Sequence, residues 1–132
     1  MSLAEDEKNA LVKYRLERAV ETMEDVRIAV GNLRWFAAAN RLYYVCFYAA
    51  SALLINDGYE ARTHSGVKAL LGLHYVSTGK IDKILNSAFG KIFNLRQTGD
   101  YDDMAEITED DIMPLIEPAE NFIKIIEKLI KN

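Results

Sequence analysis

The chain has 132 residues, of which 50% are hydrophobic and 27% charged, and its formal net charge is −4 at pH 7. These values predict one soluble globular domain over residues 1–132 that needs no disulfide or structural metal. The negative charge excludes a general nucleic-acid coat, which needs a basic surface to release counterions, so any RNA contact is expected to be local.

The first residues, Met1-Ser2-Leu3 followed by acidic side chains, lack the basic segment, apolar core and cleavage site of an export signal. No uncharged run approaches the roughly 18 residues that a membrane span needs, and the longest apolar run contains Arg41. We therefore expect a cytoplasmic protein. The single Cys46 cannot form an internal disulfide and is expected to be a small core side chain.

Two long helices are predicted first. Apolar residues in alternating steps of four and three predict one amphipathic helix that ends at Gly31-Asn32; they are Val12, Leu16, Ala19, Met23, Val26 and Val30. The segment from Trp35 to Asp57 is apolar nearly all round, which predicts a central helix that ends at the Asn56-Asp57-Gly58 breaker.

Within this central helix a strip of side chains has polar tips at helical spacing: Asn40, Arg41, Tyr44, Tyr48 and Ser51. One interpretation is a structural hydrogen-bonded network, because buried tyrosines and arginines need partners. The other is a cleft facing the helix that carries Arg96. There Arg41 and Arg96 would hold a phosphate while tyrosines stack on a base.

A short helix is expected to begin after Thr63 as N-cap, and Ser77-Thr78-Gly79 separates it from the next helix. One buried face of that next helix is predicted from Ile81, Ile84, Leu85, Ala88, Phe89 and Ile92. We expect it to end in Arg96, before a Gly99-Asp100-Tyr101 turn. A guanidinium projected from a buried face must meet carboxylates, phosphates or water, so Arg96 with Asp100 and Tyr101 is the best candidate site.

Acidic residues follow Asp100 with no lysine or arginine before Ile123, either as solvated surface or as a docking face for a basic partner. Thr108 is predicted to cap a final helix with help from Asp111, and Pro114 and Pro118 predict a kink or a short first piece. The fold class is all-α: an antiparallel up-and-down bundle of four main helices plus one short helix.

The ordered motifs resemble the HEPN superfamily of small helical domains, from about Trp35 to the last helix. They are Asn40-Arg41-Leu42-Tyr43-Tyr44, Phe47-Tyr48-Ala49-Ala50, Gly58, Thr63-His64-Ser65-Gly66-Val67, Phe93-Asn94-Leu95-Arg96 and Asp100-Tyr101. The similarity is greatest to short stand-alone members. It implies a homodimeric helix bundle, often paired with a minimal nucleotidyltransferase as toxin and antitoxin, and in many members a metal-independent endoribonuclease.

The family's catalytic signature is an arginine followed after four to six residues by a histidine. Arg96 matches the arginine, but Tyr101 stands where the histidine is expected, and no histidine follows His74. A tyrosine with a pKa near ~10 is a poor general base, and losing acid–base help costs about two to four orders of magnitude in rate. His64 is either a substitute for the missing group or a capping or surface histidine.

Three functions remain open at this point. The leading hypothesis is a homodimeric module that binds RNA or a nucleotide around Arg96 and acts with a nucleotidyltransferase. The alternatives are a ribonuclease in which His64 or Tyr101 moves the proton, and a purely structural dimerisation module. No cofactor or metal is expected, because two isolated histidines and one core cysteine do not have metal-ligand spacing.

Overall fold

The computed structural model describes residues 3–101 and 106–131, without the side chains of Leu3, Asp100 and Tyr101. The described residues form helices and no strand, which confirms the all-α class. In chain order the elements are α1 (Leu3–Gly31), α2 (Trp35–Asn56), α3 (His64–Leu71), the π-helical segment η1 (Gly72–Val76), α4 (Lys83–Tyr101) and α5 (Glu109–Lys131).

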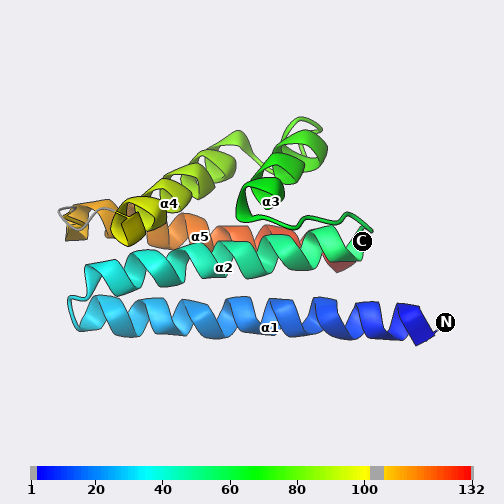
Figure 1. Cartoon of the computed structure of the whole chain (residues 1–132), viewed down its shortest axis with the longest axis horizontal. Helices are drawn as coiled ribbons and strands as arrows, with labels where there is room; N and C mark the ends of the chain where they lie inside the picture. Colours follow the sequence, from blue (N-terminus) through cyan, green and yellow to red (C-terminus); the bar gives the residue numbers. More distant parts are fainter. Residues whose placement is uncertain (1–2, 102–105, 132) are drawn as a thin grey trace.

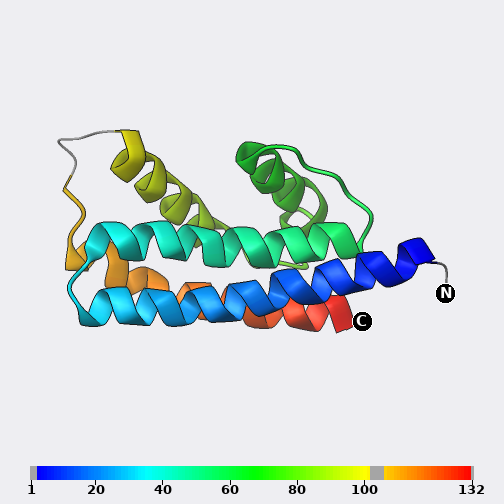
Figure 2. The same ribbon diagram turned by 60° about the horizontal axis from the view of Figure 1, so that its bottom comes forward.

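Helix α2 lies at the centre of the molecule. Helices α1 and α5 run alongside it, while α3 and α4 cover the face of α2 that lies opposite α1 (Figure 1). Turning the molecule shows that α1 and α5 lie on one side of α2 and that α3 and α4 lie on the other (Figure 2). Helix α2 therefore contacts each of the other α-helices, α1, α3, α4 and α5.

The turn between α1 and α2 differs in one detail from the prediction. Helix α1 ends at Gly31, but the left-handed residue of the turn is Leu33, with φ 57°. The Leu33 amide donates to the Val30 carbonyl (3.0 Å) and the Arg34 amide to the Ala29 carbonyl (2.8 Å), the two bonds of a Schellman motif. Glycine at position 31 signals the helix end correctly, two residues before the backbone reverses.

The apolar character of α2 makes it the core helix. Half of its residues are buried, including Leu42, Tyr43, Val45, Cys46 and Leu53. By length and composition alone α2 is sufficient to cross a membrane, but 61% of its 18-residue apolar window is buried inside the bundle. That burial is typical of the core helix of a soluble protein.

Helix α2 ends as predicted, because Gly58 adopts φ 83° and its amide donates to the Ile55 carbonyl. The predicted cap of α3 is also confirmed: Thr63 Oγ1 accepts a hydrogen bond of 2.9 Å from the Gly66 amide. This cap makes His64 the first residue of α3. The following π-helical segment Gly72–Val76 was not predicted.

Helix α4 differs from the prediction at both ends. Ile84 does not belong to its buried face: it is 75% exposed and borders an open hollow between α4 and α5. At the other end the helix does not stop at Arg96 but continues through Tyr101. Gly99 is therefore a helical residue, and its hydrogen in place of a Cβ permits close packing, since a Cβ there would lie 3.2 Å from Phe36 and 3.1 Å from Ile107.

Helix α5 begins with half of the predicted capping box, because the Asp111 carboxylate accepts hydrogen bonds from the Thr108 amide (2.9 Å) and hydroxyl (3.1 Å). Of the two predicted alternatives, a separate short first piece is wrong, because α5 is one continuous helix that contains both Pro114 and Pro118. The kink at the prolines stays a prediction. The apolar stripe of α5 packs on the core. This burial outweighs the amide bonds that the prolines remove.

Candidate functional site

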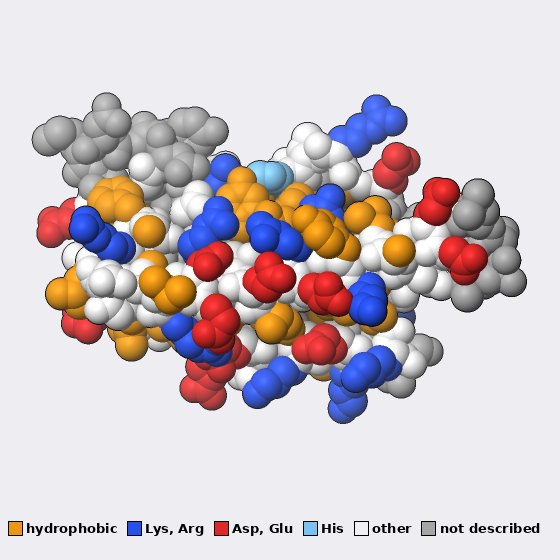
Figure 3. Space-filling model, turned by 90° about the horizontal axis from the view of Figure 1, so that it is seen from below, with side chains coloured by type: hydrophobic (Ala, Val, Ile, Leu, Met, Phe, Trp, Pro, Cys, Tyr) orange, Lys and Arg blue, Asp and Glu red, His pale blue; other side chains and the backbone are white. Residues whose placement is uncertain are grey.

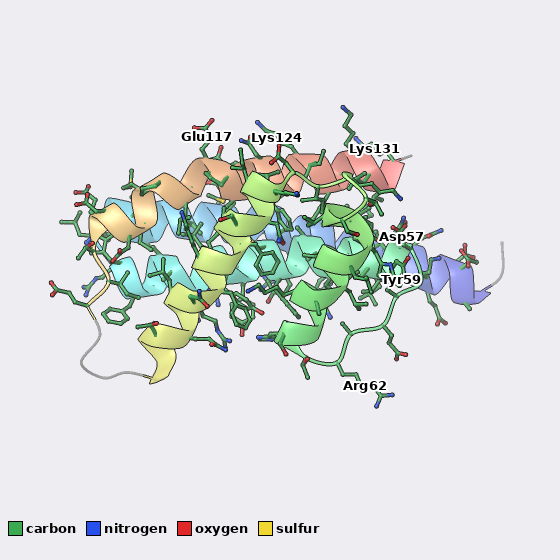
Figure 4. The ribbon with its side chains drawn as sticks, turned by 90° about the horizontal axis from the view of Figure 1, so that it is seen from above. Asp57, Tyr59, Arg62, Glu117, Lys124 and Lys131 are labelled. Carbon is green, nitrogen blue, oxygen red and sulfur yellow. The ribbon has the colours of Figure 1, made fainter. Side chains whose placement is uncertain are left out.

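The guanidinium of Arg96 lies where α2, α3 and α4 meet. Its Nη1 lies 3.3 Å from His64 Nδ1 at the start of α3. Its Cζ lies 4.9 Å from the ring centroid of Tyr43 and 5.7 Å from that of Tyr44, both on α2. Two faces of α2 and the first turn of α3 thus hold one charged group at the edge of the core. Figure 4 shows how α3 and α4 cross α2 on this side of the molecule.

His64 is half-buried in an aromatic cluster. Its ring centroid lies 4.6 Å from that of Phe47 and 5.1 Å from that of Tyr43. Burial, and then the neighbouring charge of Arg96, lower the pKa of His64. Because a guanidinium only donates, the contact with Arg96 requires an unprotonated Nδ1 and places the ring proton on Nε2. His64 is therefore neutral at pH 7 in the unliganded protein.

Tyr43 forms the floor of this cluster. The residue is fully buried, and its hydroxyl has no hydrogen-bond partner among the residues that the structure describes. Burial raises the pKa of Tyr43 above its ordinary range, although the Arg96 charge acts in the opposite direction. Its phenol stays protonated at any physiological pH, so Tyr43 contributes a ring surface under Arg96 and no general base.

The Tyr43→Phe variant is expected to be more stable than the wild-type protein by about 1 kcal/mol. A buried hydroxyl without a partner costs about 1–3 kcal/mol, and phenylalanine keeps the ring that faces Arg96. Chemical denaturation followed by circular dichroism measures the change. A loss of stability would contradict this assignment and would indicate that the hydroxyl is hydrogen-bonded in solution.

The predicted polar strip of α2 continues the site from Tyr44. The Arg41 Cζ lies 5.0 Å from the Tyr44 ring centroid, so Arg41 and Arg96 approach the same ring. Asn40 Oδ1 accepts hydrogen bonds from Arg41 Nε (3.0 Å) and Nη2 (2.7 Å) and fixes the direction of that guanidinium. Arg41 and Arg96, which the sequence predicts to act together, thus both contact the Tyr44 ring.

Tyr48 follows one turn later on α2 and brings in residues that the sequence reasoning missed. Its ring centroid lies 5.7 Å from that of Tyr44. Arg15 and Arg18 of α1 approach the Tyr48 ring, with Cζ at 5.9 and 5.2 Å from its centroid. Arg15 and Arg18 are three residues apart beside the apolar stripe of α1, and this spacing predicts that they lie on the same side of that helix. It does not predict which neighbouring helix they contact.

A cavity of about 270 Å³ opens beside Arg96 between α2 and the end of α4. It is lined by Phe36, Ala37, Ala39, Asn40, Leu95, Arg96, Gly99 and Ile107. This volume is near the lower end for small-molecule sites, enough for a phosphate with part of a sugar. The side chains of Asp100 and Tyr101, predicted to act here, lie outside the described residues.

The site around Arg96 is separate from the larger hollow of the molecule, and its described residues do not form a metal site. The larger hollow of about 620 Å³ lies between α4 and α5, with Ile84, Asp110 and Pro114 among its lining residues, and does not include Arg96. Within residues 3–101 and 106–131, no three histidine, cysteine or carboxylate side chains gather as a metal site requires. The chemistry that this arrangement offers is anion binding by guanidiniums beside one neutral imidazole.

Comparison with known proteins identifies a family whose model matches most of this chain. A family model described as HEPN domain matches residues 12–129. The chain is 39% identical over 127 residues to a UPF0332 protein of Thermotoga maritima, covering 96% of each chain. It is 33% identical over 121 residues to a Methanocaldococcus jannaschii protein named "Putative toxin", covering 92% of this chain and 90% of that protein. A second protein of that organism with the same designation is 30% identical over 122 residues, covering 89% and 83%.

Proposed function

The chain belongs to the HEPN domain family, and from its site we propose that it is a toxin-like protein that binds RNA at the cleft around Arg96. The observation that carries this proposal is the meeting of Arg96 with His64 and the rings of Tyr43 and Tyr44. The names of two relatives support the toxin-like role.

Phosphate binding follows from the chemistry of the cluster. A guanidinium offers parallel N–H donors that match two phosphate oxygens, and Arg41 lies on the same tyrosine ring as Arg96. The tyrosine rings hold both guanidiniums by cation–π contact and limit the rotamer freedom lost on binding. A half-exposed Tyr44 also presents a surface on which an unpaired base can stack.

Two partners belong to this proposal. The family resemblance implies a homodimer and a minimal nucleotidyltransferase that acts as antitoxin. The acidic first turn of α5, formed by Glu109, Asp110 and Asp111, supports a contact with a basic partner surface. Co-purification of the chain with the product of a neighbouring nucleotidyltransferase gene is the direct check.

A metal-independent ribonuclease is the second candidate, and the Arg96–His64 contact favours it specifically. When Arg96 turns to a phosphate oxygen, it releases the lone pair of His64 Nδ1. That nitrogen then accepts the proton of an RNA 2′-hydroxyl, the 2′-oxygen bonds to phosphorus, and the bond from phosphorus to the 5′-oxygen breaks. The leaving 5′-oxygen takes a proton from solvent, and Arg96 stabilises the charge on phosphorus oxygens.

Incubation of the purified protein with structured RNA and EDTA tests the proposal and separates the two candidates. Binding without cleavage is the result expected for a binding module. Cleavage that survives the chelator and disappears in Arg96→Ala assigns the ribonuclease. Neither binding nor cleavage would contradict both and leave the structural dimerisation module.

A further inference from the structure

The contacts of Tyr48 repeat those of Tyr44 one helical turn along α2. Each ring is approached by two guanidiniums: those of the proposed RNA site on Tyr44, and Arg15 and Arg18 on Tyr48. The second pair comes from a different helix, α1, which runs antiparallel beside α2 (Figure 1). Two cation pairs therefore lie on neighbouring tyrosine rings, and the centroids of these rings are 5.7 Å apart.

The second cation pair has little compensating negative charge. Within the part of the chain that the structure describes, Arg18 has one ion pair, at 3.4 Å with Glu21, whose side chain is 66% exposed. Arg15 has no carboxylate within 4 Å among the described residues, and its Nε is buried without a hydrogen-bond partner in that part of the chain. Two guanidiniums on one ring repel each other, and an anion placed between them removes this repulsion. Phosphate fits this place because it accepts hydrogen bonds from both.

We propose, on the basis of the RNA-binding function above, that Tyr48 with Arg15 and Arg18 forms a second phosphate subsite. The substrate class is then single-stranded RNA of several nucleotides and not a free nucleotide. The ring separation exceeds the ~3.4 Å axial rise of a stacked strand, as expected for a strand whose bases are splayed apart.

The surface around this subsite fits a strand that passes along one edge of the molecule. Figure 3 looks onto α1 and shows Lys or Arg side chains beside hydrophobic ones near a histidine, with acidic side chains below them. Other Lys and Arg side chains lie apart from this group, on the lower part of the same face. A row of cations with acidic side chains along one side fits one extended strand better than the two closely spaced backbones of a duplex.

Fluorescence anisotropy with two labelled 2′-O-methyl oligonucleotides tests this subsite, since these probes lack the 2′-hydroxyl that cleavage requires. A dinucleotide carries one phosphate and an octanucleotide reaches both subsites. The double variant Arg15→Gln/Arg18→Gln is expected to weaken octanucleotide binding about tenfold and to leave dinucleotide binding within about twofold. Its salt slope should be smaller by about 0.7 for the lost phosphate.

The matched control removes two charges elsewhere on α1. Lys13 is exposed and Arg27 is paired with Glu24 and Glu120, so Lys13→Gln/Arg27→Gln should leave octanucleotide affinity within about threefold. The variant Arg15→Lys/Arg18→Lys should keep most of the affinity and reports on folding together with thermal denaturation. Equal losses in variant and control, or a changed oligomeric state that accounts for the loss, would overturn the subsite.

The experiment also separates this inference from the function on which it rests. If Arg96→Ala weakens both probes while Arg15→Gln/Arg18→Gln weakens neither, the RNA site stands and the second subsite is wrong. If the wild-type protein binds neither probe, the proposed function fails, and the subsite with it. Tighter binding of a free mononucleotide than of the octanucleotide would overturn the assigned substrate class.

Discussion

Replacing Arg96 with alanine is expected to weaken binding of single-stranded RNA by about 10- to 150-fold. A hydrogen bond that involves a charged group contributes about 1.5–3 kcal/mol, and this guanidinium lies beside the cavity, the imidazole and two tyrosine rings at once. If the protein is a ribonuclease, cleavage falls by a larger factor, because Arg96 then also faces the charge that develops at phosphorus. Anisotropy with an uncleavable oligonucleotide measures the first effect.

Two further variants make this result specific. Lys124→Ala removes one positive charge from α5, where Figure 4 places Lys124 on the side away from α3 and α4, and it should leave affinity nearly unchanged. Arg96→Lys keeps the charge but loses the planar pair of donors, so we expect it to recover only part of the affinity. A fully active Arg96→Lys would show that charge alone is recognised.

The same variant distinguishes the structural alternative. The alanine variant loses cation–π contacts with Tyr43 and Tyr44 that contribute about 0.5–2 kcal/mol in all, so some loss of thermal stability is expected under every hypothesis. If the proposed dimer dissociates or the melting temperature falls while RNA affinity stays at the wild-type value, Arg96 is a packing residue. The assignment of the site would then be wrong.

The helices could be predicted because their signals are local. The Thr63 cap, the Gly58 stop and the Thr108 start each depend on hydrogen bonds within a few residues, and the structure contains all three. At two places where the prediction failed, packing contacts that a local pattern does not contain decided the outcome. Helix α4 passes Gly99 because Phe36 and Ile107 pack against it, and α5 tolerates two prolines because its stripe is buried.

The sequence singled out several residues that the structure brings together around Arg96, but it did not determine their arrangement. Arg41, Tyr44 and Tyr48 share one strip of α2 by spacing alone, and Arg96 was singled out as a charge on a buried face. Which nitrogen of His64 would meet Arg96 depends on how α3 crosses α2, which no local pattern determines. Arg15 and Arg18 were overlooked for the same reason, since their contact with Tyr48 depends on the α1–α2 register.

His64 is expected to give RNA binding and RNA cleavage opposite pH dependences. Burial and the Arg96 charge hold the pKa of His64 below its ordinary value of about 6.5, so the unliganded imidazole gains a proton only in more acidic solution. A protonated imidazole adds a second positive charge beside a bound phosphate. RNA affinity should therefore rise as pH falls from 7 to 5, by about tenfold for one charged hydrogen bond.

Cleavage should change in the other direction, because a general base needs the unprotonated Nδ1. Its rate should fall over the same pH range, and His64→Gln should lower it by about two to four orders of magnitude at pH 7 while keeping binding measurable. In that variant the acid-side rise of affinity should also disappear. Affinity measured with the 2′-O-methyl probe and cleavage measured with native RNA in EDTA give the two profiles separately.

Protein stability provides the control for both profiles. Because the folded protein holds the pKa of His64 below its unfolded value, the unfolded chain binds the proton first. The contribution of this residue to stability is complete above about pH 6.5 and is lost as pH falls toward the folded pKa. Denaturation curves at each pH must therefore show a folded protein before affinities are compared. An RNA affinity that does not change between pH 7 and 5 in a folded wild-type protein would contradict a phosphate bound beside a protonated His64.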